Sequence, residues 1–152
     1  IFQMGGLVNA GNDAIRVTGG DLMGCEIDLN ATPDALPMMA VLACFARGTT
    51  RLVNVPQARI KETDRIAVMK KELTKMGANI EELADGLVIH ESQLHGADVD
   101  GHGDHRVIMS LAIAASRATG KTTIHGYEAV AVTFPTFVEH LAALGGEVLV
   151  IE

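Results

Sequence analysis

DALPMMAVL, at residues 34–42, sets the expected fold, because one acidic residue opens a run that is apolar on nearly every side. DHRVIMSLA, at residues 104–112, has the same form at an offset of 70 residues. A repeat of this length predicts one supersecondary unit used twice, with each copy burying a face against the other. Flanking segments recur at offsets of 72 and 68: GTTRL at 48–52 matches GKTTI at 120–124, and MGANI at 76–80 matches LGGEV at 144–148.

The first unit is expected to alternate strands and helices and to end in a hairpin that turns at Asp85-Gly86. Apolar periodicity and turn residues define its parts. The predicted elements are a strand at 26–29, a buried helix at 34–47, a strand at 50–55, an amphipathic helix at 62–76, and hairpin strands at 78–83 and 87–91.

The second unit repeats this order. Thr133 is a candidate cap for its second helix, Pro135 suits a first turn, and Gly77 and Gly145 are expected to end the two amphipathic helices. That second helix has an apolar stripe of Phe134, Phe137, Val138, Leu141 and Leu144. The predicted elements are strands at 97–100, 122–125 and 147–151, and helices at 104–118 and 133–144.

Residues 38–46 and 107–115 are apolar almost all round, so we expect these helices to lie inside the domain. The strands then form the outer wall, whereas an ordinary doubly wound α/β fold places its helices outside the sheet. The sequence therefore predicts an α/β domain with helices inside and sheets outside.

Composition indicates one compact domain that does not bind nucleic acid or cross a membrane. The chain of 152 residues is 48% apolar, carries a net charge of -7, and has no Trp and one Tyr, so it lacks the basic and aromatic surface that nucleic acids need. The longest apolar run, residues 36–46, has 11 residues and contains Pro37, against roughly 20 for a membrane span. Cys25 and Cys44 lack C-x-x-C spacing, which favours reduced thiols in the cytoplasm.

RIKETDR, at residues 59–65, places five ionisable side chains at the expected start of the helix at 62–76. Glu62 and Asp64 suit the positive end of a helix dipole, whereas Lys61 and Arg65 do not. Cations held against the dipole indicate an anion shared between them. The alternative is a solvated first turn, in which Lys61 and Arg65 pair with Glu62 and Asp64.

Both buried helices also begin with a carboxylate that can act as a helix cap, Asp34 in the first unit and Asp104 in the second. Arg106, next to His105, is poorly placed in a first helical turn unless an anion lies nearby. If the units pack side by side, the three helix starts form one anion-attracting surface. Such fixed charges stabilise charge that develops during transfer of a phosphorylated group.

A metal site is the competing interpretation for four histidines and two aspartates near the end of the first unit and the start of the second. No pair has the i, i+4 spacing of a zincin helix, and no phosphate-binding loop of the G-x-x-x-x-G-K-[ST] type occurs, so we expect neither. The residues in question are His90, His95, His102 and His105 with Asp98 and Asp100.

RIKETDR resembles the K-E-[ST]-D-R signature of the 5-enolpyruvylshikimate-3-phosphate (EPSP) synthase family. DHRVIM at residues 104–109 is similar to the family's D-H-R-x-A-M pattern, and the resemblance extends from GCEID at 24–28 to TFP at 133–135. It implies an inverse α/β, barrel-like domain of β-α-β-α-β-β units, with helices packed internally. On this resemblance residues 21–92 and 93–152 are two of the three units of a C-terminal domain, and residues 1–20 are the tail of a preceding unit. Because the chain begins at Ile1 rather than Met, we expect it to be cut from a longer protein.

The resemblance implies transfer of the enolpyruvyl group of phosphoenolpyruvate to the 5-hydroxyl of shikimate 3-phosphate, a step of aromatic amino acid biosynthesis. The reaction adds and then eliminates through a tetrahedral intermediate, with no metal or organic cofactor. The implied catalytic residues are Asp34, as acceptor of the hydroxyl proton, with Lys61 and Glu62; the implied substrate-binding residues are Asp34, Gln57, Lys61, Arg65, His105 and Arg106. Gln57 and Lys61 would contact the shikimate phosphate, Arg65 and Arg106 would bind phosphoenolpyruvate, and His105 would lie near its phosphate.

Ile108 departs mildly from the Ala of the family's D-H-R-x-A-M pattern, and two further departures concern the site itself. Val132 stands where many members have a Lys that contacts phosphoenolpyruvate, and Gln57 stands where many have an Asn. The family also binds most of the shikimate phosphate through an N-terminal domain, with the site in the cleft between domains. We therefore expect this chain to hold half a site and to show negligible turnover alone.

Two alternatives remain. One is the sister enolpyruvyl transferase that acts on UDP-N-acetylglucosamine, against which the intact KETDR argues. The other is a non-catalytic domain that kept the fold as an interaction module.

Overall fold

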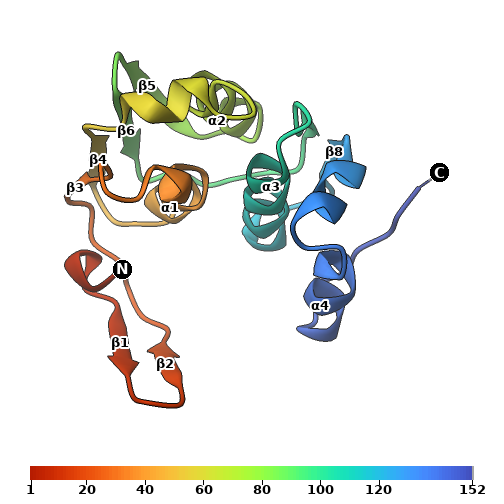
Figure 1. Ribbon diagram of the computed structural model, residues 1–152, viewed down its shortest axis with the longest axis horizontal. Helices are drawn as coiled ribbons and strands as arrows, with labels where there is room; N and C mark the ends of the chain where they lie inside the picture. Colours follow the sequence, from red (N-terminus) through yellow and green to blue (C-terminus); the bar gives the residue numbers. More distant parts are fainter. Residues whose placement is uncertain (152) are drawn as a thin grey trace.

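The computed structural model describes residues 1–151 and places three helices between outer strands (Figure 1). Helices α1, α2 and α3 contact one another, and the four-stranded sheet β3-β4-β6-β5 lies outside α1 and α2. The strands are β1 (Leu7–Ala10), β2 (Ile15–Thr18), β3 (Glu26–Asp28), β4 (Thr49–Val53), β5 (Asn79–Leu83), β6 (Gly86–His90), β7 (Asp98–Asp100) and β8 (Thr123–His125). The α-helices are α1 (Leu36–Cys44), α2 (Arg65–Lys75), α3 (His105–Arg117) and α4 (Phe137–Ala143), and the 3-10 helices are η1 (Phe2–Met4), η2 (Pro33–Ala35), η3 (Pro56–Ile60) and η4 (Tyr127–Val132).

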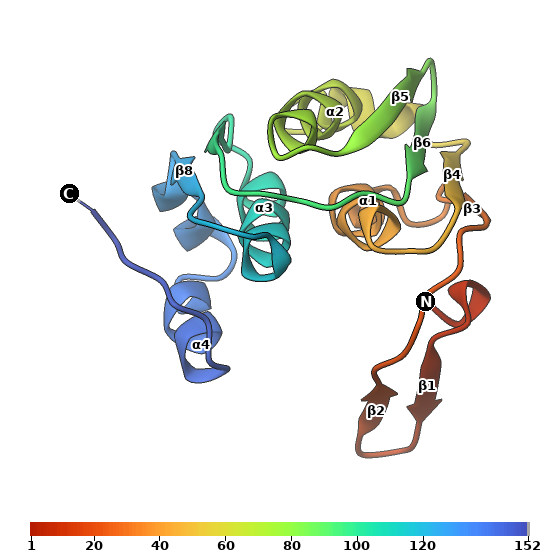
Figure 2. The same cartoon turned by 180° about the vertical axis from the view of Figure 1, so that it is seen from behind.

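The core lies along α1, as its apolar sequence predicts. Leu36, Ala40, Ala43 and Cys44 are fully buried. Seen from behind, α1 and α3 again lie between the sheet and β8 (Figure 2). This arrangement confirms the predicted α/β fold with helices inside and strands outside, because a helix that is apolar on most sides is stable only when other elements surround it.

The two units also share their backbone pairing. Parallel strands β3 and β4 pair Ile27 with Leu52, and parallel strands β7 and β8 pair Val99 with Ile124, both shifted by 72 residues. Gly24 and Gly96 are separated by the same 72 residues, and a Cβ would collide with the backbone of Thr49 at the first and of Lys121 at the second. The sequence repeat therefore reflects a structural repeat.

The helix predicted at 62–76 begins three residues late. The Asp64 carboxylate accepts a hydrogen bond from the Ala67 amide at 3.0 Å, which makes Asp64 the cap and Arg65 the first helical residue. The backbone of Lys61 is extended. Lys61 and Glu62 therefore lie in the approach to α2 and not in its first turn.

The end of the second unit departs further from the predicted elements. The helix predicted at 133–144 is shortened to α4, because a residue before proline, here Phe134, is disfavoured in the helical conformation. Thr133 follows the end of η4 and does not cap the start of α4, which has Thr136 in that position. α4 has no buried residue. The predicted strand at 147–151 is wrong: these residues form no strand, and no strand in residues 1–151 lies beside them to supply hydrogen bonds.

Strands β1 and β2 form an antiparallel hairpin that projects from the rest of the chain (Figures 1 and 2). Its residues are exposed except for the half-buried Val8. The predicted division at residues 20 and 92 stays a prediction. Among residues 1–151, no helix has both the length and the apolar character that crossing a membrane requires.

Candidate functional site

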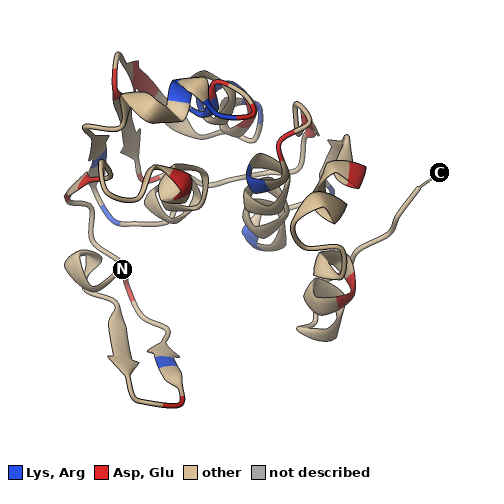
Figure 3. Cartoon of the chain, viewed as in Figure 1, with Lys and Arg blue, Asp and Glu red and all other residues tan. Residues whose placement is uncertain are grey.

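Charged residues from three helix starts meet at one place. Asp34 lies in η2 directly before α1, Lys61 and Glu62 precede Arg65 at the start of α2, and Asp104 and Arg106 lie at the start of α3. Figure 3 shows acidic and basic residues on neighbouring parts of these helices. The charge cluster, as we call it, consists of Asp34, Lys61, Glu62, Arg65, Asp104 and Arg106.

Arg65 is the centre of the charge cluster, and its side chain is fully buried. Its guanidinium donates to Asp104 through Nε at 2.8 Å and through Nη2 at 3.2 Å, to Asp34 through Nη1 at 2.8 Å, and to Glu62 through Nη2 at 2.7 Å. Burial lowers the pKa of Arg65, but its hydrogen bonds to carboxylates outweigh burial and raise the pKa above its usual value. A guanidinium with this many carboxylate partners ties the starts of α1, α2 and α3 together.

Asp34 faces three cations at the edge of the cluster. One oxygen lies 3.2 Å from Lys61 Nζ and 2.8 Å from Arg65 Nη1, and the other lies 3.5 Å from Arg106 Nη2. Its side chain is 47% exposed, so solvent and a ligand can reach it. Burial raises the pKa of Asp34, but the hydrogen bond from Lys61, the charge of Arg106 and the hydrogen bond from Arg65 together hold it below its usual value.

The two carboxylates predicted as caps behave differently. Asp104 does cap α3, accepting from the Arg106 amide at 2.9 Å and the Val107 amide at 3.4 Å. Asp34 makes no side-chain cap bond to η2 or α1. Because Asp34 does not cap a helix, its contacts with the cations are what hold it.

The solvated-turn alternative for residues 61–65 is half right. Arg65 does pair with Glu62, but Asp64 pairs with Arg59 at 2.7 Å and Lys61 pairs with Asp34, which lies in another segment. The charges therefore form connections between elements. A turn stabilised only by its own side chains would not place Lys61 against the start of α1.

The other predicted site residues lie on α3 and η3. His105 is buried in the first turn of α3. Gln57 lies in η3, and its Oε1 is buried without a hydrogen-bond partner among residues 1–151. Val132, where the family pattern has a cation, is 77% exposed at the end of η4. Binding of substrate by Gln57, Arg65 and His105 stays a prediction.

The sequence did not indicate which residues hold Arg65. Asp34 and Asp104 lie 31 and 39 residues away from it. The useful signal was the repeat, because it placed both carboxylates at equivalent helix starts. A buried arginine requires acidic partners, and the repeat marks two of the three that Arg65 has.

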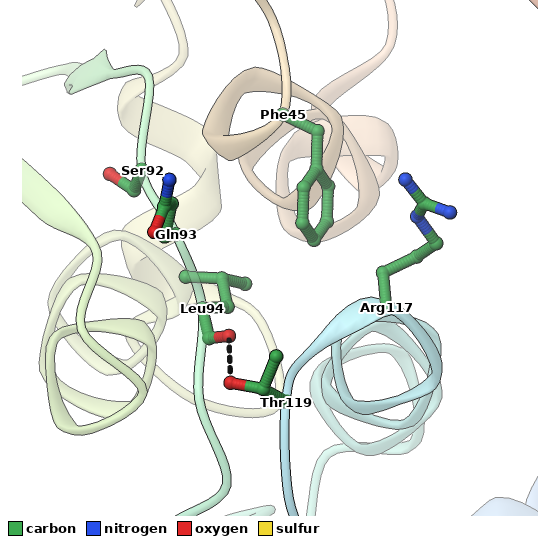
Figure 4. A pocket seen from close by; sticks show the side chains of 6 residues that line it. All are labelled: Phe45, Ser92, Gln93, Leu94, Arg117 and Thr119. Atoms are coloured by element: carbon green, nitrogen blue, oxygen red, sulfur yellow. Dashed lines mark hydrogen bonds between the residues drawn. The ribbon is translucent and has the colours of Figure 1, made fainter.

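A pocket lies at the C-terminal ends of α1 and α3, away from the helix starts that form the charge cluster (Figure 4). It has a volume of about 240 Å³, and the Arg117 guanidinium lies 6.0 Å from the centre of the Phe45 ring. None of the predicted site residues lines it. Within residues 1–151 we find no group of three side chains arranged to hold a metal ion. The charge cluster is therefore the better candidate site.

Comparisons with known proteins give a consistent result. The family model described as EPSP synthase (3-phosphoshikimate 1-carboxyvinyltransferase) matches residues 1–141. A 3-phosphoshikimate 1-carboxyvinyltransferase from Ruminiclostridium cellulolyticum is 59% identical over 97% of this chain and 35% of its own length. One from Methanocella arvoryzae is 49% identical over 88% of this chain and 32% of its own length. The chain thus spans about a third of the length of these curated relatives.

Solved structures agree in fold. EPSP synthase from Acinetobacter baumannii superposes with a TM-score of 0.90 at 32% identity, over 99% of this chain and 39% of that one. The enolpyruvyl transferase NikO from Streptomyces tendae superposes with a TM-score of 0.79 at 22% identity, over 96% of this chain and 34% of that one. Together with the family match over residues 1–141, these results show that the chain belongs to the EPSP synthase family.

Proposed function

We propose that these 152 residues supply part of the active site of an enzyme that transfers the enolpyruvyl group of phosphoenolpyruvate to the 5-hydroxyl of shikimate 3-phosphate. The convergence of Asp34, Lys61 and Arg106 at three helix starts is the observation that carries the proposal. Both substrates are polyanions, and cations fixed around an exposed carboxylate can bind anions and move a proton at the same place. The rest of the site belongs to an N-terminal domain, which is the partner of this segment.

Each residue of the site has a proposed role. Arg106 and Arg65 bind phosphoenolpyruvate, and His105 lies beside its phosphate. Lys61 and Gln57 hold the shikimate phosphate, and the amide nitrogen of Gln57 is the group that donates to it. Lys61 and Glu62 share proton transfer. The reaction needs no metal and no organic cofactor.

Asp34 accepts the proton of the attacking hydroxyl. In the free site three cations stabilise its charged form, so it is a weak base. Phosphate and carboxylate groups that bind Lys61 and Arg106 neutralise those cations, and the pKa of Asp34 then rises. The carboxylate therefore becomes a better base when both substrates are present, which is when the chemistry requires it.

The two thiols support a proposed location in the cytoplasm. Cys25 and Cys44 are both free, and burial raises the pKa of Cys44 to about 12, which keeps it an unreactive thiol. Free thiols fit a reducing cytoplasm, where we place the enzyme.

The direct test uses the full-length protein, meaning the complete product of the gene that encodes these residues. With phosphoenolpyruvate and shikimate 3-phosphate we expect release of one phosphate for each enolpyruvyl product, detected by phosphorus NMR. Arg106→Ala should raise KM for phosphoenolpyruvate. Turnover only when UDP-N-acetylglucosamine replaces shikimate 3-phosphate would assign the sister reaction, and no turnover with either acceptor would favour a non-catalytic domain.

A further inference from the structure

Glu72 is a charged side chain in the interior whose purpose the proposed site does not explain. It lies on α2, and its carboxylate is fully buried. A buried carboxylate is costly unless hydrogen bonds and cations compensate for the lost water. The partners of Glu72 therefore indicate what it stabilises.

Two of those partners belong to the loop that leads into α3. The Asp100 amide donates to Glu72 Oε2 at 3.1 Å, and His102 Nε2 lies 2.9 Å from Glu72 Oε1. An ionised carboxylate only accepts, so Nε2 of His102 carries the hydrogen. Glu72 thus holds a backbone group and a side chain on both sides of Gly101.

The remaining partners are cations on α2 itself. Lys75 Nζ lies 2.6 Å from Oε2, and Lys71 Nζ lies 3.6 Å from Oε1. Burial raises the pKa of Glu72, but the hydrogen bonds from His102, Lys75 and the Asp100 amide lower it to about 2. The carboxylate is therefore ionised at neutral pH and can accept from all of its partners at once.

The held loop determines where Arg106 lies. His102 has a left-handed backbone with a φ of 52°, and its amide donates to Asp100 Oδ1 at 2.6 Å. The Asp104 amide then donates to the Gly101 carbonyl at 2.9 Å, and the Asp104 carboxylate caps the turn that contains Arg106. A shift of this loop would therefore move Asp104 and Arg106 together.

Glu72 and Arg65 act on this loop from the same side of α2. They are seven residues apart, which is two helical turns, so both side chains project from one face of the helix. Arg65 holds the Asp104 carboxylate, and Glu72 holds Asp100 and His102. The start of α3 is thereby attached to α2 at two separate points.

We propose that Glu72, acting through His102 and the Asp100 amide, is a positioning residue that fixes the start of α3 so that Arg106 faces Asp34. This inference rests on the proposed function for one point, that Arg106 binds phosphoenolpyruvate. The attachment of the loop to α2 does not depend on it. The two parts can therefore be tested separately.

The attachment is tested by hydrogen exchange of the full-length protein, which requires no activity. Glu72→Gln removes the negative charge. The donors that bind two carboxylate oxygens in wild type then have only one amide oxygen to bind. We expect faster exchange at the amides of residues 100–107 and unchanged exchange in β5 and β6. The matched control is Glu81→Gln, because Glu81 also lies near a histidine, His90 at 3.5 Å, but on the surface. Equal exchange in Glu72→Gln and wild type at residues 100–107 would overturn the attachment.

The consequence for the site is tested by kinetics. Glu72→Gln should raise KM for phosphoenolpyruvate on the order of tenfold, with KM for shikimate 3-phosphate nearly unchanged. If Glu72→Gln does not fold, His102→Asn is the second variant, since Asn tolerates a left-handed backbone but does not reach Glu72. His102→Gln restores an N–H donor near the position of Nε2 and should recover most of the loss.

Four outcomes separate the claims. Faster exchange with a selective rise in KM for phosphoenolpyruvate supports the inference. Faster exchange with both KM values unchanged, or with both raised equally, overturns the positioning of Arg106. Failure of His102→Gln to recover any of the loss in His102→Asn overturns the part assigned to the Nε2 hydrogen bond. An inactive wild-type protein with faster exchange in Glu72→Gln refutes the proposed function and leaves the attachment confirmed.

Discussion

At the scale of single residues, the neighbours of Asp34 hold its carboxylate without covering it. Three cations surround it, yet its side chain stays 47% exposed. A purely structural ion pair gains most when it is fully covered and fully hydrogen-bonded. Asp34 instead keeps one side open to solvent, where a hydroxyl group can approach its oxygen atoms.

Asp34→Asn tests this role. The amide keeps the size of the side chain but cannot take up the hydroxyl proton, so we expect kcat of the full-length protein to fall by about 10²–10⁴-fold. KM for phosphoenolpyruvate should change little. Steady-state kinetics with both substrates gives both values.

The control for Asp34→Asn is Asp21→Asn. Asp21 also pairs with an arginine, Arg47 at 2.7 Å, but lies outside the charge cluster. It should retain the wild-type kcat. A kcat for Asp34→Asn within twofold of wild type would show that another group accepts the proton.

Residue patterns predicted which charged residues gather at the helix starts but not how they pair. The KETDR and DHR segments identified Lys61, Arg65 and Arg106, and the repeat identified Asp34 and Asp104. The burial of Arg65 could not be predicted, because its carboxylate partners come from three segments and only the tertiary fold brings them together. The burial of Glu72 could not be predicted either, because a glutamate in an amphipathic helix normally faces solvent.

At the scale of elements, α2 connects the two units. Arg65 and Glu72 reach from it to the start of α3, and its apolar side contributes Ile66, Met69 and Leu73 to the core. The polar connections fix the relative position of helix starts that apolar packing alone would leave free to slide. This dependence on an ionised glutamate implies a sensitivity to acid.

Acid unfolding measures that sensitivity. A carboxylate with a lowered pKa stabilises the folded state above its usual value of 4.5, and the stabilisation is lost as the pH falls towards about 2. The lowering of the Glu72 pKa from 4.5 to about 2 corresponds to about 3 kcal/mol in the free energy of unfolding. Between pH 7 and pH 3, urea unfolding of the full-length protein should therefore show a loss of stability that is about 2 kcal/mol smaller in Glu72→Gln than in wild type.

Glu81→Gln provides the reference for acid unfolding, since the Glu81 side chain is 69% exposed. It should lose as much stability between pH 7 and pH 3 as wild type does. Equal losses in all three proteins would mean that Glu72 has an ordinary pKa in the folded state.

Elements inside the repeat followed their sequence patterns, whereas their ends depended on local competition. α1, α3 and the hairpin β5–β6 lie where apolar periodicity and turn residues predict them. α2 starts late because Asp64 takes the capping position, and the segment before α4 is interrupted at Pro135. Periodicity identifies the face of a helix that is buried, but a cap or a proline decides where the helix begins.

At the scale of the whole molecule, helices that are apolar nearly all round forced the inverted arrangement of layers. That inference needed no tertiary information, because such helices must be surrounded. The segment at 147–151 has a suitable strand pattern but no strand in residues 1–151 to pair with, so pattern alone was insufficient. The repeat explains why Asp34 and Asp104 lie at equivalent helix starts, and Lys61, Glu62 and Arg65 of the α2 segment complete the charge cluster between them.

The most direct test of this account is a crystal structure of the full-length protein with phosphoenolpyruvate and shikimate 3-phosphate bound. We predict hydrogen bonds from Lys61 and Arg106 to substrate oxygen atoms, with the Asp34 carboxylate within hydrogen-bond distance of the 5-hydroxyl. Substrates bound elsewhere, for example beside Phe45 and Arg117 at the far ends of α1 and α3, would contradict the claim that the three helix starts form the site.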